Sequence, residues 1–144
     1  MQPKGAQDPK SQAWRYEAVS HGIRVVVAPR YLEDRSDPGE SRFFWAYTVE
    51  ITNLSQETIQ LRARYWRIVD GNGKQQEVRG PGVVGEEPVI LPGDSYEYTS
   101  GCPLTTPSGF MVGHYQVETG RGERLTVEIP AFSLDLPGEG RIIN

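Results

Sequence analysis

Apolar residues in this chain recur at every second position, and this period of two constrains the fold more than any other feature. In residues 43–51 one set of alternating side chains consists of Phe43, Trp45, Tyr47, Val49 and Ile51. The intervening positions are smaller or more polar on average. Strict alternation of this kind is typical of a β-strand that has one face in a core.

Five further segments are strand candidates: residues 22–32, 58–69, 95–100, 110–119 and 124–136. The run Asp70-Gly71-Asn72-Gly73 predicts a hairpin turn, and residues 120–123 predict another. Pro29 and Pro130 lack the N–H that a ladder needs, so we expect their strands to be edges or bulged there. About seven or eight strands with no long helix predict an all-β fold, a β-sandwich.

The apolar parity of residues 58–69 changes along the segment. One face carries Ile59, Leu61, Ala63 and Tyr65, whereas Trp66 and Ile68 are apolar at the opposite parity. This change predicts a bulge near Tyr65 and Trp66, or a strand buried on both sides there. Simple alternation also places Arg62 and Arg64 together on the solvent face.

The 144 residues suit one domain, which we assign to residues 16–137. Residues 1–15 are polar and lack periodicity, so we expect a flexible N-terminal arm, and we expect a flexible tail over residues 138–144. Cys102 is the single cysteine, which excludes an intrachain disulfide.

The charge balance and the apolar runs bear on partners and location. The net charge of −4 and the sequence pI of about 5.2 argue against a nucleic-acid partner. No apolar stretch is long enough to cross a membrane, and the N-terminus lacks the apolar segment of a secretory signal. We therefore expect a cytoplasmic protein without membrane contact.

Gly80, Gly82 and Gly85 form a G-x-G-x-x-G pattern, which in dinucleotide-binding proteins holds a pyrophosphate between a strand and a helix N-terminus. Here Pro88 and Pro92 exclude a long helix after the pattern, and Pro81 removes one N–H from any cradle. The sequence therefore favours a turn in which glycines permit positive φ and Val83-Val84 pack against one end of the sandwich.

Other combinations of chemically active residues are weaker. The cations Arg62, Arg64, Arg67, Lys74 and Arg79 could form a basic stripe, although a salt-bridged solvent face is the favoured interpretation. The histidines and acidic loops match no metal-site spacing, so we predict no metal and no cofactor.

Pairs of Cys102 or Ser108 with His114 lack a supporting catalytic signature. We therefore predict no catalytic residue and no enzyme activity.

Four segments in order resemble the ApaG family, also called CorD: FFWAYTVEITNLS, RYWRIVDGNGKQQEVRGPGVVGEEPVILPGDSYEYTSG, TPSGFMVGHYQV and IPAFSLDLP. The resemblance spans residues 19–137. It implies an immunoglobulin-like or fibronectin type III-like β-sandwich. It also implies a link with cobalt resistance and magnesium efflux, and a partner-binding role like that inferred for related domains in F-box proteins.

Two functional hypotheses follow. The first is a non-enzymatic protein interaction module that presents the glycine loop with Arg64, Trp66 and Arg79 to an unidentified protein, and whose exposed sheet edge could also pair to form a homodimer. The alternative is a small-ligand or divalent-ion sensor that uses the loop from Gly80 through Gly82 to Gly85 for an anion such as a nucleotide phosphate.

Overall fold

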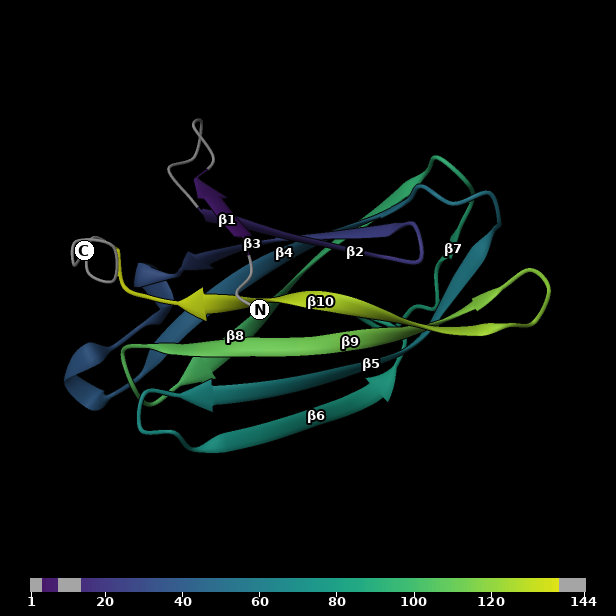
Figure 1. The fold of residues 1–144 in the computed structure, drawn as a ribbon. Helices are drawn as coiled ribbons and strands as arrows, with labels where there is room; N and C mark the ends of the chain where they lie inside the picture. The colour runs from purple at the N-terminus through teal and green to yellow at the C-terminus, as the bar shows by residue number, and fades with distance from the viewer. Residues whose placement is uncertain (1–3, 8–13, 138–144) are drawn as a thin grey trace.

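The computed structural model describes residues 4–7 and 14–137, and these residues form two antiparallel β-sheets that pack face to face (Figure 1). The first sheet has the strand order β1-β2-β3-β4-β8, with β1 at Lys4–Gln7, β2 at Trp14–Ser20, β3 at Ile23–Tyr31, β4 at Phe43–Asn53 and β8 at Ser95–Leu104. The second has the order β10-β9-β5-β6, with β5 at Ile59–Asp70, β6 at Gln75–Pro81, β9 at Gly109–Thr119 and β10 at Arg124–Leu134. Strand β7 (Val89–Ile90) pairs with β5, and two 3-10 turns, η1 (Glu33–Arg35) and η2 (Pro38–Glu40), precede β4.

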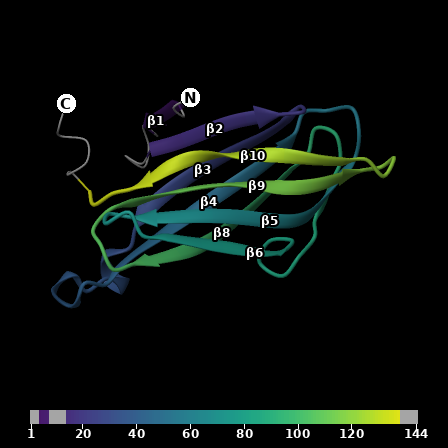
Figure 2. The ribbon, with the colours of Figure 1, turned by 60° about the horizontal axis from the view of Figure 1, so that its bottom comes forward.

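The two sides of the sandwich differ. Strand β10 packs against β2 and β3, which closes one side (Figure 2). On the other side lie β8 and β6, the outermost strands of their sheets. The edge strands β8 and β6 therefore lie on the side of the sandwich that β10 does not close.

The core lies between the inner faces of the two sheets. Trp66 packs edge-on against Phe132, with ring centroids 5.9 Å apart, and against Tyr47 at 5.3 Å. Trp45 and Tyr115 are also fully buried. Each large apolar side chain contributes roughly 1.5–3 kcal/mol when it leaves water, so this aromatic cluster is a major source of stability.

The predicted all-β sandwich is confirmed, and strands occupy all six predicted segments. Over the described residues there are ten strands instead of seven or eight. Four were not predicted: β1, β2, β6 and β7. Strand β6 lies at a sheet edge with largely exposed side chains, so burial imposes no apolar alternation on its sequence.

Two segments of the expected N-terminal arm, residues 1–15, belong to strands. Residues Lys4–Gln7 form β1, and β2 begins at Trp14. Gly5 pairs with Tyr16 in this ladder. Backbone pairing to a neighbouring strand needs no apolar period, which is why the sequence did not reveal it. The expected tail, residues 138–144, lies outside the described residues.

The two prolines occupy positions where a ladder can spare their N–H. The β10–β9 register shifts between Ile129 and Phe132, so Pro130 lies in a bulge, as predicted. Strand β3 is not an edge strand, but Pro29 lies beyond Val27, the last β3 residue paired with β2.

Candidate functional site

A bulge in β5 decides which of its side chains reach solvent. The β5–β9 register shifts between Leu61 and Ala63, so the extra residue is Arg62 and not Tyr65 or Trp66. Beyond this bulge the even-numbered residues turn inward. The expectation that Arg62 and Arg64 share the solvent face is therefore wrong.

Arg62 remains outside and binds two carboxylates. Its Nη1 lies 2.8 Å from Oε1 of Glu87, and its Nε lies 3.0 Å from Oε1 of Glu118. These hydrogen bonds, that of Glu118 first, raise the pKa of the Arg62 guanidinium. Arg62 therefore ties the segment after the glycine loop to the outer face of β9.

Arg64 points inward and holds the glycine loop. It pairs across the ladder with Gly80, where an added Cβ would lie 3.0 Å from the guanidinium nitrogens. Its Nη1 donates to the carbonyl oxygens of Pro81 at 2.9 Å and Gly82 at 3.0 Å. Gly80 thus makes room for a side chain that fixes the start of the loop.

The rest of the loop is a tight turn. Val83 and Glu86 exchange backbone hydrogen bonds of 2.8 and 2.9 Å, and between them Val84 and Gly85 have φ of 42° and 83°. Two central residues with positive φ define a type I′ turn. Val83 is fully buried and Val84 is 54% exposed, so only the first of the two valines packs against the sandwich.

The loop geometry opposes a phosphate cradle. The amide of Gly82 donates to the carbonyl of Arg62 at 2.8 Å, and that of Val83 is used within the turn. Pro81 has no N–H to offer. An anion at this loop would have to compete with backbone hydrogen bonds for its donors.

The other predicted contact residues divide between the core and the surface. Trp66 is only 3% exposed, so its ring is part of the core and is not presented to a partner. Arg79 is on the surface, with 69% of its side chain exposed. Arg64, Trp66 and Arg79 therefore do not form one contact surface.

Arg79 instead belongs to a stack on the outer face of the second sheet. Its guanidinium carbon lies 4.5 Å from the ring centroid of Tyr65, which in turn stacks on His114 with centroids 5.0 Å apart. The Tyr65 hydroxyl donates to Glu77 at 2.7 Å, and this bond is the main cause of the raised pKa of Tyr65. We call these three residues, Arg79, Tyr65 and His114, the outer stack.

Apolar side chains continue this outer face along β9. Phe110 is 40% exposed and shares the parity of Val112 and His114. Once the bulge is placed at Arg62, alternation along β5 and β9 assigns all of these residues to one face. Local periodicity did not reveal this face, because it placed the bulge near Tyr65 and Trp66 and not at Arg62.

The possible nucleophiles are far from the bases that would activate them. Cys102 is buried in the first sheet, where desolvation raises the pKa of its thiol to about 11. His114 stacks on Tyr65 on the outer face of the second sheet. Ser108 lies in the β8–β9 connection, where its carbonyl accepts from Thr106. The structure therefore brings neither Cys102 nor Ser108 next to His114.

The interior contains a hydrogen-bonded tyrosine pair. The hydroxyl groups of Tyr98 and Tyr115 bond to each other across the two sheets. Desolvation is the main cause of the raised pKa of both phenols. The pair is a polar crosslink inside an apolar core, and both phenols remain neutral over the physiological pH range.

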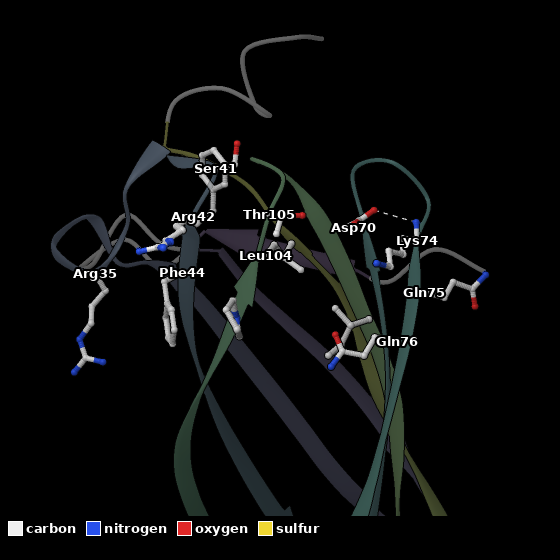
Figure 3. Close-up of a pocket in the computed structure, with 13 residues that line it drawn as sticks. Arg35, Ser41, Arg42, Phe44, Asp70, Lys74, Gln75, Gln76, Leu104 and Thr105 are labelled. Carbon is white, nitrogen blue, oxygen red and sulfur yellow. Dashed lines mark hydrogen bonds between the residues drawn. The ribbon is translucent and has the colours of Figure 1, made fainter. Parts of the chain in front are cut away.

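A pocket of about 500 Å³ opens between the sheets on the side of β8 and β6. Figure 3 shows Leu104 and Thr105 facing Lys74 and Gln76 across this opening, whereas the Arg35 side chain extends away from it. Lys74 of the predicted basic stripe lines the pocket, whereas the predicted contact residues do not: Gly80, Gly82, Gly85, Arg64, Trp66 and Arg79. No pattern in the sequence indicated it, because its walls come from segments distant along the chain.

Residues 4–7 and 14–137 contain neither a metal-binding cluster nor a membrane-spanning helix. Among these residues no group of three or more His, Cys, Asp or Glu side chains could hold a metal ion. No helix in this part of the chain is long and apolar enough to cross a membrane.

Two packed antiparallel sheets, a glycine turn tied to an inward arginine and an aromatic outer face define a small β-sandwich protein. The family model described as the ApaG domain matches residues 33–119, more than half of the chain. The chain belongs to the ApaG family.

Relatives and a solved structure agree with this assignment. Protein ApaG of Mesorhizobium japonicum is 60% identical over 129 residues, which are 90% of this chain and 99% of that protein. Protein ApaG of Brucella anthropi is 58% identical over 129 residues, again 90% of this chain and 99% of that protein. A crystal structure described as an ApaA protein, from Bordetella pertussis, matches with a TM-score of 0.80 and 43% identity, over 85% of this chain and 98% of that chain.

Proposed function

We propose that this chain is a non-enzymatic protein interaction module whose contact surface is the outer face of β5, β6 and β9. The outer stack supports the proposal, because an arginine and two aromatic rings lie together on the outer face of the sheet. Arginine and aromatic side chains anchor protein interfaces more often than other residues do. This surface replaces the sequence-based one, retaining Arg79 and omitting Trp66.

The composition of this face suggests the kind of partner. Phe110 and Val112 supply apolar area, and Arg67 and Arg79 flank the carboxylate of Glu77 across the β5–β6 ladder. A protein surface with an apolar patch and an acidic side chain would complement it. The association with cobalt resistance and magnesium efflux would then operate through this protein contact.

Photo-crosslinking tests the proposal. A photoreactive phenylalanine analogue replaces Phe110 in the chain expressed in its native cells, and a matched chain carries the analogue at Val19. Val19 is 55% exposed on the outer face of the first sheet and serves as the control. We expect a discrete adduct with another protein from position 110 only, identified by mass spectrometry.

A second change tests whether the face itself is responsible. Val112→Asp places a charge beside Phe110 and should abolish the adduct, whereas Val19→Asp should not. Thermal unfolding by circular dichroism verifies that both variants fold. Equal adducts from positions 110 and 19, or none from either, would overturn the proposal.

A further inference from the structure

Strand β6 has an available edge. It pairs with β5 along one side, and within residues 4–7 and 14–137 no strand pairs with its other side. It lies at the border of its sheet in both ribbon views (Figures 1 and 2). Such an edge presents backbone N–H and C=O groups to any extended chain that can align with it.

The β5–β6 register shows which backbone groups face outward. At one end Asp70 N donates to Lys74 O, and at the other Gly82 N donates to Arg62 O. Hydrogen-bonded and non-hydrogen-bonded residue pairs alternate along an antiparallel ladder. The bonded pairs at the two ends therefore identify the same β6 residues as bonded to β5. Gln76, Val78 and Gly80 bond to β5, whereas Gln75, Glu77 and Arg79 direct their N–H and C=O groups to the free edge, with the carbonyl of Pro81 beyond them.

The charged side chains of one copy of this edge are complementary to those of a second copy. When two copies of β6 align antiparallel about Val78, Glu77 of each copy lies opposite Arg79 of the other. The pairs of Glu77 with Arg79 are then the hydrogen-bonded pairs, as their outward backbone groups require. Pro81 falls opposite Gln75 and has no N–H, so this pair forms only the bond from the Gln75 N–H to the Pro81 carbonyl, which also accepts from Arg64. Pairing centred on Glu77 or on Arg79 would instead place like charges opposite each other, which destabilises a strand pair.

We propose that β6 is a self-recognition edge, through which two copies of this chain join their second sheets into one continuous antiparallel sheet about a twofold axis at Val78. Charged residues usually protect an exposed edge from pairing. Here Glu77 and Arg79 are two positions apart and of opposite sign, so they select one partner in one register. Arg79 and Glu77 belong both to this edge and to the proposed partner face, but the two proposals have separate readouts, because the crosslinking position Phe110 lies on β9, which β5 separates from the edge.

Charge reversal tests both the dimer and its register by sedimentation equilibrium over a concentration series. Glu77→Arg alone and Arg79→Glu alone each place like charges opposite at two symmetric positions, and each should weaken association by about tenfold or more. The double variant Glu77→Arg with Arg79→Glu should restore it. Arg121→Glu is the control for Arg79→Glu and has the same charge change, since Arg121 pairs with Glu57 away from the edge and its reversal should leave association unchanged.

Cysteine crosslinking gives a second readout of the register. Val78 would lie opposite itself in a non-bonded pair, where Cα atoms approach about 4.5 Å and a disulfide can form. Val78→Cys should therefore give a covalent dimer on oxidation, whereas Gln76→Cys, opposite Gly80, should not. The native Cys102 is buried and does not compete.

A strictly monomeric wild type, a double variant that does not regain association, or equal crosslinking from positions 76 and 78 would overturn the proposal. A photo-adduct at position 110 from a monomeric chain would support the protein contact while removing the dimer. A charge-sensitive dimer without that adduct would do the reverse.

Discussion

Gly80 lies opposite Arg64 in the β5–β6 ladder, and the Arg64 guanidinium occupies the space that a side chain at position 80 would need. The first glycine of the G-x-G-x-x-G pattern thus admits an arginine that binds the loop from the inside. The glycine pattern therefore has a structural explanation within the chain itself.

Arg64→Met should lower the free energy of unfolding by about 1–2 kcal/mol, because the carbonyls of Pro81 and Gly82 lose a charged donor while the aliphatic packing is kept. Urea unfolding measures the change. Arg30→Met, at an exposed position of β3, is the control and should have little effect. Equal losses in the two variants would contradict the role assigned to Arg64.

Gly82→Ala should destabilise the fold by about 3 kcal/mol or more, since it adds a left-handed backbone penalty and a steric clash. The new Cβ would clash with the backbone oxygen of Glu86, and φ at this position is 54°. Gly85→Ala at a φ of 83° meets open space, so we expect a loss of only about 1 kcal/mol there. Thermal unfolding of both variants provides the comparison, and a larger loss at Gly85 would refute this view of the turn.

Val84→Asn should stabilise the protein by about 0.5–1 kcal/mol. A β-branched residue at a φ of 42° is strained, whereas asparagine is favoured at this position of a type I′ turn. Little apolar burial is lost, because Val84 is 54% exposed. Chemical denaturation measures the gain, and Val89→Asn at a similarly exposed strand position should not reproduce it.

Stability should fall as the pH rises above about 10, the ordinary pKa of tyrosine. Burial raises the pKa of Tyr98 and of Tyr115, so the unfolded chain releases these protons at a lower pH than the folded chain does. Loss of protons from the unfolded state favours unfolding, so the contribution of this pair is complete below that pH and declines above it.

Urea midpoints from pH 7 to strongly alkaline solution test this dependence. Replacing both residues, Tyr98→Phe with Tyr115→Phe, should flatten the alkaline decline. Either single replacement leaves one buried hydroxyl without its partner and should cost about 1–3 kcal/mol at neutral pH. An alkaline profile that the double replacement leaves unchanged would show that other groups control it.

The alternation of apolar residues was enough to predict most strands of both sheets, because a strand with one buried face must repeat its apolar residues at period two. The same reasoning predicted the bulge at Pro130, since proline cannot donate to a ladder. It also rejected the nucleotide interpretation of Gly80, Gly82 and Gly85 from the residues around them. The overall resemblance to the ApaG family, visible in ordered segments, was likewise a property of the sequence.

The position of the bulge in β5 was decided only by tertiary structure. A one-residue shift moves every later side chain to the other face. The predicted position near Tyr65 and the observed position at Arg62 differ only in what packs against them. That shift turns Arg64 inward and leaves Tyr65 outside to stack between Arg79 and His114. The identity of the outer face and the free edge of β6 depend on pairing between distant segments, which local periodicity does not encode.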